Sequence, residues 1–239
     1  WMKNSRSTMM LRVSLHIMQE VRLSKMKSLT VEQTTDMIIK ACDAIVENKP
    51  YLTEVDSKIG DGDHGIGMAG GMEKAKSMLT EKRPFPDINT VFKTTGMSML
   101  NSMGGASGVI FGTMFLGGVK NLEPVQELDG HLMARIMRGS LDAIKERGKA
   151  NLGDKTMVDA LEPAVIALEN GNKEDLVQLM KEAKDAAWQG VENTKNYIAK
   201  YGKAKTLGER AIGCQDAGAT SVAIIFNAMY EYVESLAQS

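Results

Sequence analysis

An acidic, glycine-rich segment carries the residues whose types and spacing best suit chemistry. Asp56, Asp61, Asp63 and His64 place three carboxylates and an imidazole within nine residues. Carboxylates crowded in this way repel one another unless a cation neutralises them. Mg²⁺ is usually held by one or two carboxylates together with phosphate oxygens and water. The segment therefore predicts a magnesium site in which Asp56, Asp61 and Asp63 share two ions.

Two other structures use similar residues. Aspartate and glycine are common in ordinary solvated turns, and this alternative stays open on the sequence. A calcium-binding EF-hand loop is excluded. Counted from Asp61, its sixth position should be glycine and is Ile66, and its twelfth should be glutamate and is Met72.

Glycines directly after the acidic segment point to phosphate. Gly65, Gly67 and Gly70 match the GxGxxG pattern, but no strand precedes them and no βαβ unit surrounds them, so a dinucleotide-binding fold is excluded. Glycines at the start of a helix still expose backbone N–H groups, and the helix dipole attracts anions there. We expect a phosphate cradle beside the metal site.

Three later segments are weaker candidates for ligand contacts. The run 104–108 opens a helix with small residues and offers the Ser107 hydroxyl, although tight helix packing explains it equally well. The run 148–156 resembles a Walker A loop, but Asp154 interrupts the Gly-Lys-Thr order, and we expect Asp154 to cap the next helix. The loop 202–215 supplies cations, and a solvated loop is its simpler explanation.

The elements that must position these segments are helices almost throughout. Thr30 and Gln33 have capping-box spacing, Asp87 and Asp216 can cap later helices, and glycine, proline and asparagine mark the breaks. Many helices with short connections and no βαβ alternation predict an all-α fold, an antiparallel bundle or closed barrel of about eight helices. The predicted helices are 30–50, 65–84, 87–103, 106–119, 129–148, 154–170, 172–200 and 216–236, with a polar turn at 52–65.

Composition narrows the class of protein. The 239 residues include 29 Lys and Arg against 30 Asp and Glu, so no electrostatic footprint for nucleic acid or membrane is expected. The two cysteines, Cys42 and Cys214, lack CxxC spacing, which favours a reducing cytoplasm over a disulfide framework. No apolar run reaches the roughly 18 to 20 residues of a membrane helix. We expect one domain over 28–239, preceded by an extension over 1–27 of uncertain role.

Taken together, the motifs resemble the nucleotide-binding L subunit of bacterial dihydroxyacetone kinase. That family shows an Asp-x4-Asp-x-Asp-His-Gly turn, a Gly-Gly-Ala-Ser-Gly turn, a Gly-Asp-Lys-Thr-Met turn and a Gly-Glu-Arg…Asp-x-Gly-Ala-Thr-Ser segment. All four occur here in order, over about residues 28–236. The resemblance implies a closed barrel of eight antiparallel helices with the nucleotide at one end.

The resemblance also implies roles for individual residues. Asp56, Asp61 and Asp63 would hold two Mg²⁺ ions against the phosphates of ADP or ATP. Residues His64, Gly65, Ile66 and Gly67 would contact phosphate, Ala106 and Ser107 would line the phosphate side, Gly148 and Met157 would line the adenosine side, and Lys203, Asp216, Ala217 and Gly218 would close over the nucleotide.

Three positions depart from the family pattern. Lys203 stands where Arg is usual, and an ammonium is a point charge that cannot make the bidentate contact of a guanidinium. Cys214 and Ala217 replace a common His and Pro. These departures bear on nucleotide retention and on partner docking.

The implied function is phosphoryl transfer by positioning and electrostatics. In such systems the L subunit keeps ADP bound, a phosphohistidine on subunit M rephosphorylates that ADP to ATP, and the ATP donates its phosphoryl group to dihydroxyacetone held on subunit K. We expect these partners, and a homodimer stays open. Two alternatives also stay open: an ATP-dependent kinase subunit for another ketose or an acyl substrate, and an ADP-sensing regulatory module.

Overall fold

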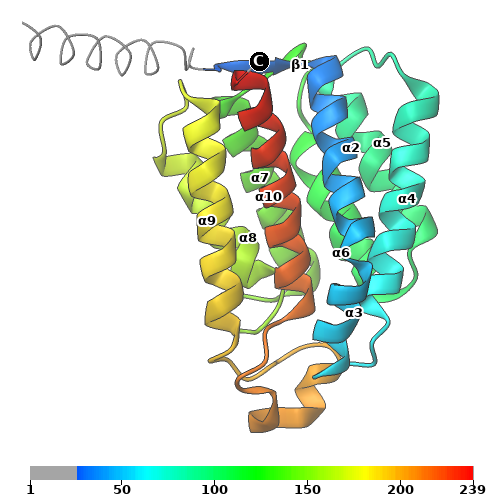
Figure 1. Cartoon of the computed structure of the whole chain (residues 1–239), viewed down its shortest axis with the longest axis vertical. Coiled ribbons are helices and arrows are strands. Elements are labelled where there is room, and N and C mark those ends of the chain that lie inside the picture. The colour runs from blue at the N-terminus through cyan, green and yellow to red at the C-terminus, as the bar shows by residue number, and fades with distance from the viewer. Residues whose placement is uncertain (1–25, 239) are drawn as a thin grey trace, which may run out of the picture.

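The computed structural model describes residues 26–238, and helices make up almost all of it (Figure 1). The predicted all-α class is confirmed. Within these residues the α-helices are α2 (Val31–Glu47), α3 (Lys49–Ser57), α4 (His64–Lys82), α5 (Ile88–Ser102), α6 (Gly105–Leu116), α7 (Gly130–Gly148), α8 (Val158–Asn170), α9 (Leu176–Thr194) and α10 (Ala217–Ala237). The remaining elements are the strands β1 (Ser28–Thr30) and β2 (Glu127–Asp129) and the 3₁₀ helices η1 (Gly117–Val119) and η2 (Lys203–Ala211).

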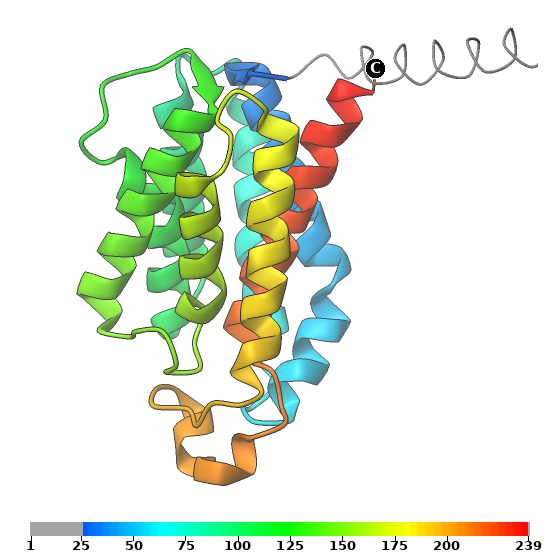
Figure 2. The same cartoon turned by 90° about the vertical axis from the view of Figure 1, so that its left-hand side faces the viewer.

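The eight long helices form a ring. Helix α2 packs against α4, and from α4 to α10 each helix packs against the next one along the chain. Helix α10 also packs against α2, so the last helix closes on the first. Figures 1 and 2 show all eight lying roughly along one long axis.

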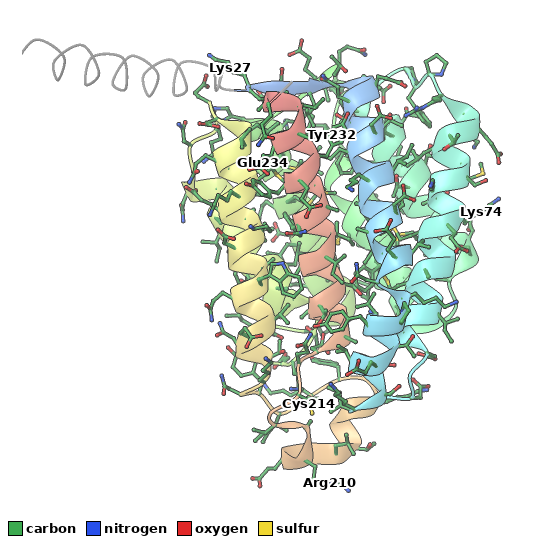
Figure 3. The ribbon with its side chains drawn as sticks, viewed as in Figure 1. Lys27, Lys74, Arg210, Cys214, Tyr232 and Glu234 are labelled. Atoms are coloured by element: carbon green, nitrogen blue, oxygen red, sulfur yellow. The ribbon has the colours of Figure 1, made fainter. Side chains whose placement is uncertain are left out.

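Because neighbouring helices run in opposite directions, the connections gather at two ends. The connections 58–63, 103–104, 149–157 and 195–216 lie at the end drawn lowest in Figures 1 and 2, which we call the lower end. The upper end holds the antiparallel pair β1 and β2, in which Leu29 faces Leu128. There the Leu176 N–H also donates to the Met26 carbonyl at 2.8 Å. Cys214 and Arg210 mark the lower end in Figure 3, and Lys27 marks the upper end.

The helix starts follow local capping chemistry. Thr30 and Gln33 form the predicted capping box at the start of α2. Asp87 and Asp216 each accept a hydrogen bond from the backbone N–H three residues ahead, as predicted, and so cap α5 and α10. Methionine fills much of the core between the helices, in keeping with its adaptable side chain. The fully buried methionines are Met37, Met68, Met72, Met99, Met114, Met133, Met137, Met180 and Met229.

Two predicted helix boundaries were wrong. The predicted turn at 52–65 is helical in its first half, because α3 begins at Lys49 with Pro50 in its first turn, where proline costs no hydrogen bond. The predicted helix 154–170 begins only at Val158, and Asp154 does not cap it. The Asp154 carboxylate instead accepts from the Asn151 N–H at 2.8 Å and pairs with Lys200 Nζ at 2.5 Å.

The C-terminal part of the chain adds two differences. The predicted helix 172–200 is shorter and spans α9, which Asp175 caps through the Gln178 N–H. The predicted irregular loop at 202–215 contains η2, which bends at Gly208. Residues 1–25, most of the predicted extension, lie outside the described residues. Within residues 26–238, every helix is too short or too polar to span a bilayer.

The two cysteines should differ sharply in reactivity. Burial raises the pKa of the Cys42 thiol to about 12, whereas Cys214 is partly exposed near the lower end. Because the thiolate is the reactive species, we expect the native protein to react rapidly with one equivalent of a chromogenic disulfide reagent. Denatured protein should react with two. A C214S variant should lose the fast reaction, and a second fast equivalent in native protein would contradict the assigned burial.

Candidate functional site

Three carboxylates meet at the lower end. Asp56 lies in the last turn of α3, and Asp61 and Asp63 lie in the connection that follows. One carboxylate oxygen from each lies within 4.8 Å of those of the other two. Asp56 is half-buried, and the other two are exposed. The donor set consists of hard oxygen ligands, which are those that Mg²⁺ prefers.

The backbone around Gly60 places the Asp56 carboxylate. The Gly60 N–H donates to the Asp56 carbonyl at 2.5 Å. A Cβ built on Gly60 would collide with the Asp56 carboxylate oxygen, so only glycine lets the chain pass this close. On the other side, the His64 N–H donates to Asp56 Oδ2 at 3.3 Å. Gly60 and His64 therefore hold Asp56 in place, facing the carboxylates of Asp61 and Asp63.

A cation from a distant part of the chain already touches this cluster. Lys203 Nζ, from the start of η2, forms an ion pair with Asp61 Oδ2. Both side chains are well exposed, so the pair is screened by water and is weak as a contribution to stability. The contact nevertheless brings the 195–216 segment against the carboxylates. A metal ion bound by Asp61 would compete with Lys203 for the same oxygen.

His64 turns its ring away from solvent. Its Nε2 lies 2.8 Å from the Ser221 hydroxyl on α10, and its ring centroid lies 5.9 Å from that of Phe111 on α6. Burial lowers the pKa of His64, with partial opposition from the Asp56 carboxylate. Burial thus favours the neutral form of the ring, and the contact with Ser221 ties α4 to α10. Exposed Ile66 and the open face of Gly67 remain on the surface that was predicted to meet phosphate.

Helix direction gives the lower end a further property. Helices α4, α6, α8 and α10 all begin there, so four helix N-termini are directed toward the same region. The N-terminus of a helix carries a partial positive charge and unpaired N–H groups. At the start of α6, Gly104 gives no side-chain cap, and Ala106 is exposed beside half-buried Ser107. This arrangement favours an anionic ligand such as phosphate.

The two remaining predicted groups also lie at this end. Gly148 ends α7, and buried Met157 directly precedes α8. A Cβ built on Gly218 would lie 3.4 Å from the Met157 Cβ, so the start of α10 lies beside the start of α8. Asp216 caps α10 through the Ala219 N–H at 2.7 Å, with buried Ala217 following it. Burial raises the pKa of Asp216 to about 7, despite that hydrogen bond.

Sequence reasoning gave no role to two buried charged residues, Asp159 in the first turn of α8 and Lys155 in the 149–157 turn. Asp159 accepts from the Gly153 N–H at 2.5 Å and from the Thr156 N–H at 2.7 Å, and it therefore shapes this turn. Burial raises the pKa of its carboxyl. Lys155 is also buried, and its ammonium bonds to backbone carbonyls rather than facing solvent. The contact of Asp159 with the Thr156 N–H spans three residues and could have been predicted from the sequence. The partners of Lys155 lie far away in the sequence and could not.

Comparisons with known proteins agree with this geometry. Residues 58–231 match the model of the DAK2 domain. The chain is 42% identical over 187 residues to the ADP-binding subunit DhaL of PEP-dependent dihydroxyacetone kinase 1 from Listeria innocua, covering 78% of this chain and 89% of that one. It is 37% identical over 200 residues to the corresponding Escherichia coli subunit, covering 82% and 93% respectively.

A solved structure gives the same fold. The dihydroxyacetone kinase of C. freundii, in complex with AMP-PNP and Mg²⁺, superposes with a TM-score of 0.66 and 27% sequence identity. The match covers 88% of this chain and 35% of the C. freundii chain, so the present chain spans about a third of that protein. These findings confirm the resemblance identified from the four motifs. The chain belongs to the DAK2 domain family, together with the ADP-binding DhaL subunits of dihydroxyacetone kinases.

Proposed function

We propose that this chain is the nucleotide-binding subunit of a dihydroxyacetone kinase, which holds ADP or ATP with Mg²⁺ and relays a phosphoryl group. The observation that carries the proposal is the meeting of three carboxylates at the end where four helix N-termini converge. The relatives named as ADP-binding subunits support it, since this chain covers most of their length. The C. freundii complex with AMP-PNP and Mg²⁺ supports the ligand class.

The carboxylates would hold the metal. We assign Asp56, Asp61 and Asp63 as the ligands of two Mg²⁺ ions, since all three offer oxygen and two of them face solvent. When bound, the ions would neutralise charge on the nucleotide phosphates. The protein's own part is to fix Asp56 through Gly60 and His64. The ammonium of Lys203 would then be free to leave Asp61 for a phosphate oxygen.

The remaining residues would position the nucleotide. The first turn of α4, at His64, Gly65, Ile66 and Gly67, and that of α6, at Ala106 and Ser107, present backbone N–H groups for phosphate. Gly148 and Met157 would line the adenosine side. Lys203 and the turn Asp216, Ala217 and Gly218 belong to the segment that would close over the ligand. Phosphoryl transfer in such a site relies on positioning and charge, so no general base is assigned to this chain.

The surface at the lower end supports docking of partner proteins. Six of the eight large apolar side chains that are exposed within the described residues lie on α3, at the start of α4, or in the connections 149–157 and 195–216. Clustered exposed apolar side chains are typical of interaction sites. We propose that they receive a phosphohistidine carrier, subunit M, and the triose-binding subunit K. The six residues are Tyr51, Ile66, Leu152, Ile198, Tyr201 and Ile212.

A kinase for another ketose is the second candidate. The chain is 35% identical to an L-erythrulose kinase from Pectobacterium atrosepticum and covers 34% of it. Identity is higher, and coverage of the relative nearly complete, for the DhaL subunits, which favours the first proposal. An ADP-sensing role would use the same ligand site. We expect the chain to act in the cytoplasm, where its phosphoryl donor and acceptor subunits would meet it.

The chain should retain its nucleotide through purification. We expect about one ADP and two Mg²⁺ per chain, because charge-neutralised phosphates are held at a site built from carboxylates and helix N-termini. The variant Asp61→Ala should lose both ligands. The measurement is chromatography of the nucleotide released on denaturation, with metal analysis of the same sample. Asp142→Ala, at an exposed position on α7, is the control that keeps both. A wild-type preparation that is empty and indifferent to Mg²⁺ would sink the proposal.

Gly60 should be needed for cation affinity without being a ligand. An added methyl group in Gly60→Ala collides with the Asp56 carboxylate and displaces it. Misorienting a ligand typically costs about 10- to 100-fold in metal affinity. The measurement is calorimetric titration of nucleotide-free protein with Mn²⁺ or Mg²⁺.

The matched control for this test is Gly70→Ala. It adds the same methyl group within α4, where nothing lies within 4 Å of the new atom. Its cation affinity should equal that of wild type. Equal affinity in Gly60→Ala and Gly70→Ala would contradict the role given to Asp56.

A further inference from the structure

The segment between α9 and α10 leaves the ring and returns to it at nearly the same place, so that its two ends lie side by side. The Gly213 N–H donates to the Lys195 carbonyl at 2.7 Å. The Asp216 N–H donates to the Thr194 hydroxyl at 3.0 Å. Outgoing and returning chain are therefore bonded together where the segment begins and ends. We call Thr194, Lys195, Gly213, Cys214 and Asp216 the neck.

A lysine from a third part of the chain bonds to both sides of the neck. Lys155 Nζ donates to the Thr194 carbonyl at 2.6 Å and to the Cys214 carbonyl at 2.5 Å. The residue is 2% exposed. Hydrogen bonds from a charged donor are roughly twice as strong as neutral ones. One ammonium thus ties the outgoing chain, the returning chain and the 149–157 turn together.

The backbone conformation of Lys155 would suit glycine better than lysine, so we infer that lysine occupies this position because of its side-chain contacts. Its φ is +60°, in the left-handed region that glycine adopts without strain. A buried charge also has to be desolvated, and burial accordingly lowers the pKa of Lys155. The carboxylates of Asp216 and Asp159 oppose that shift. Both the backbone strain and the desolvation of the ammonium cost free energy at Lys155. The hydrogen bonds to the two carbonyls offset that cost.

The same turn holds the outgoing side of the segment at two more points. Lys200 Nζ pairs with Asp154 Oδ1 at 2.5 Å, and the Tyr201 hydroxyl donates to the Lys149 carbonyl at 2.9 Å. Beyond these, η2 reaches the carboxylate cluster through Lys203. That contact is the one that a bound metal ion would displace. With that contact displaced, the segment would stay attached to the rest of the protein through the neck and through Lys200 and Tyr201.

We propose that Lys155 is a positioning residue that locks the neck, keeps the 195–216 segment closed over the nucleotide, and so sets the rate of nucleotide release. The inference rests on the function proposed above and adds to it a determinant of retention. The residue sits in the run that resembles a Walker A loop, yet its ammonium binds the protein's own carbonyls.

The test is the variant Lys155→Met in the full chain, which keeps an unbranched side chain one atom shorter and removes its donors. Release of a fluorescent ADP analogue, chased with excess ADP in the presence of Mg²⁺, should be about tenfold faster than from wild type, because two charge-assisted hydrogen bonds are lost. In nucleotide-free protein, hydrogen exchange should accelerate at the Gly213 and Asp216 amides. Mn²⁺ affinity should not fall, because Lys155 contacts no residue of the carboxylate cluster and a less restrained Lys203 would compete less for Asp61.

The matched control is Lys145→Met. Lys145 on α7 is half-buried and pairs with Glu162 at 2.9 Å, but it does not contact the neck. It should leave release within twofold of wild type, even where its thermal midpoint falls as far as that of Lys155→Met. Release from Lys155→Met that matches wild type would overturn the proposal. So would acceleration of exchange that is equal at the neck and along the buried part of α9, since that pattern reports general loosening.

A second variant covers the case in which Lys155→Met does not fold. Thr194→Val keeps the shape of the side chain and removes the hydroxyl that the Asp216 N–H bonds to. It should also release the analogue faster, by a smaller factor, and unchanged release would overturn the lock. If wild type binds no analogue, the proposed function fails. The exchange comparison between Lys155→Met and wild type then still decides whether Lys155 locks the neck.

Discussion

The structure depends on one constraint: each of eight helices has an apolar face to bury, and short connections make ring neighbours run in opposite directions. Alternation sends every second connection to the same end. It also directs the N-termini of α4, α6, α8 and α10 there. Segments that are far apart in sequence thus share one surface, and the partial positive charges of four helices accompany the carboxylates that need a cation.

The balance of charge at this end links the site to its covering segment. Asp56, Asp61 and Asp63 repel one another, and Lys203 compensates part of that repulsion in the structure. A cation and an ammonium cannot both occupy the Asp61 oxygen. Under the proposed function, metal binding would therefore be coupled to the contact between Lys203 and Asp61, whereas the hydrogen bonds from Lys155 to the neck do not involve the carboxylates. The 195–216 segment thus meets the carboxylates through Lys203, and it is held at the neck by different contacts, those of Lys155.

Local chemistry was readable from the sequence, and long-range partners were not. The capping box at Thr30 and the caps at Asp87 and Asp216 involve neighbours within three residues, and they were predicted correctly. Asp154 looked like a cap, but Lys200 and Asn151 take its carboxylate. Lys155 has partners 39 and 59 residues away, which no local pattern reveals. The acidic cluster was visible because its three members lie close in sequence, whereas its contact with Lys203 was not.

Closure of the ring by α2 and α10 has a consequence for synthesis of the protein. The carboxylates follow the first helix of the ring, while Lys203, the neck and the start of α10 belong to roughly the last fifth of the chain that forms the ring. Contacts between distant parts of a chain form late, because the intervening loop must first be closed. A nascent chain that lacks η2 and α10 already contains Asp56, Asp61 and Asp63, but not the segment with Lys203 that contacts them. Under the proposed function, nucleotide capture would therefore have to wait until α10 has packed between α9 and α2.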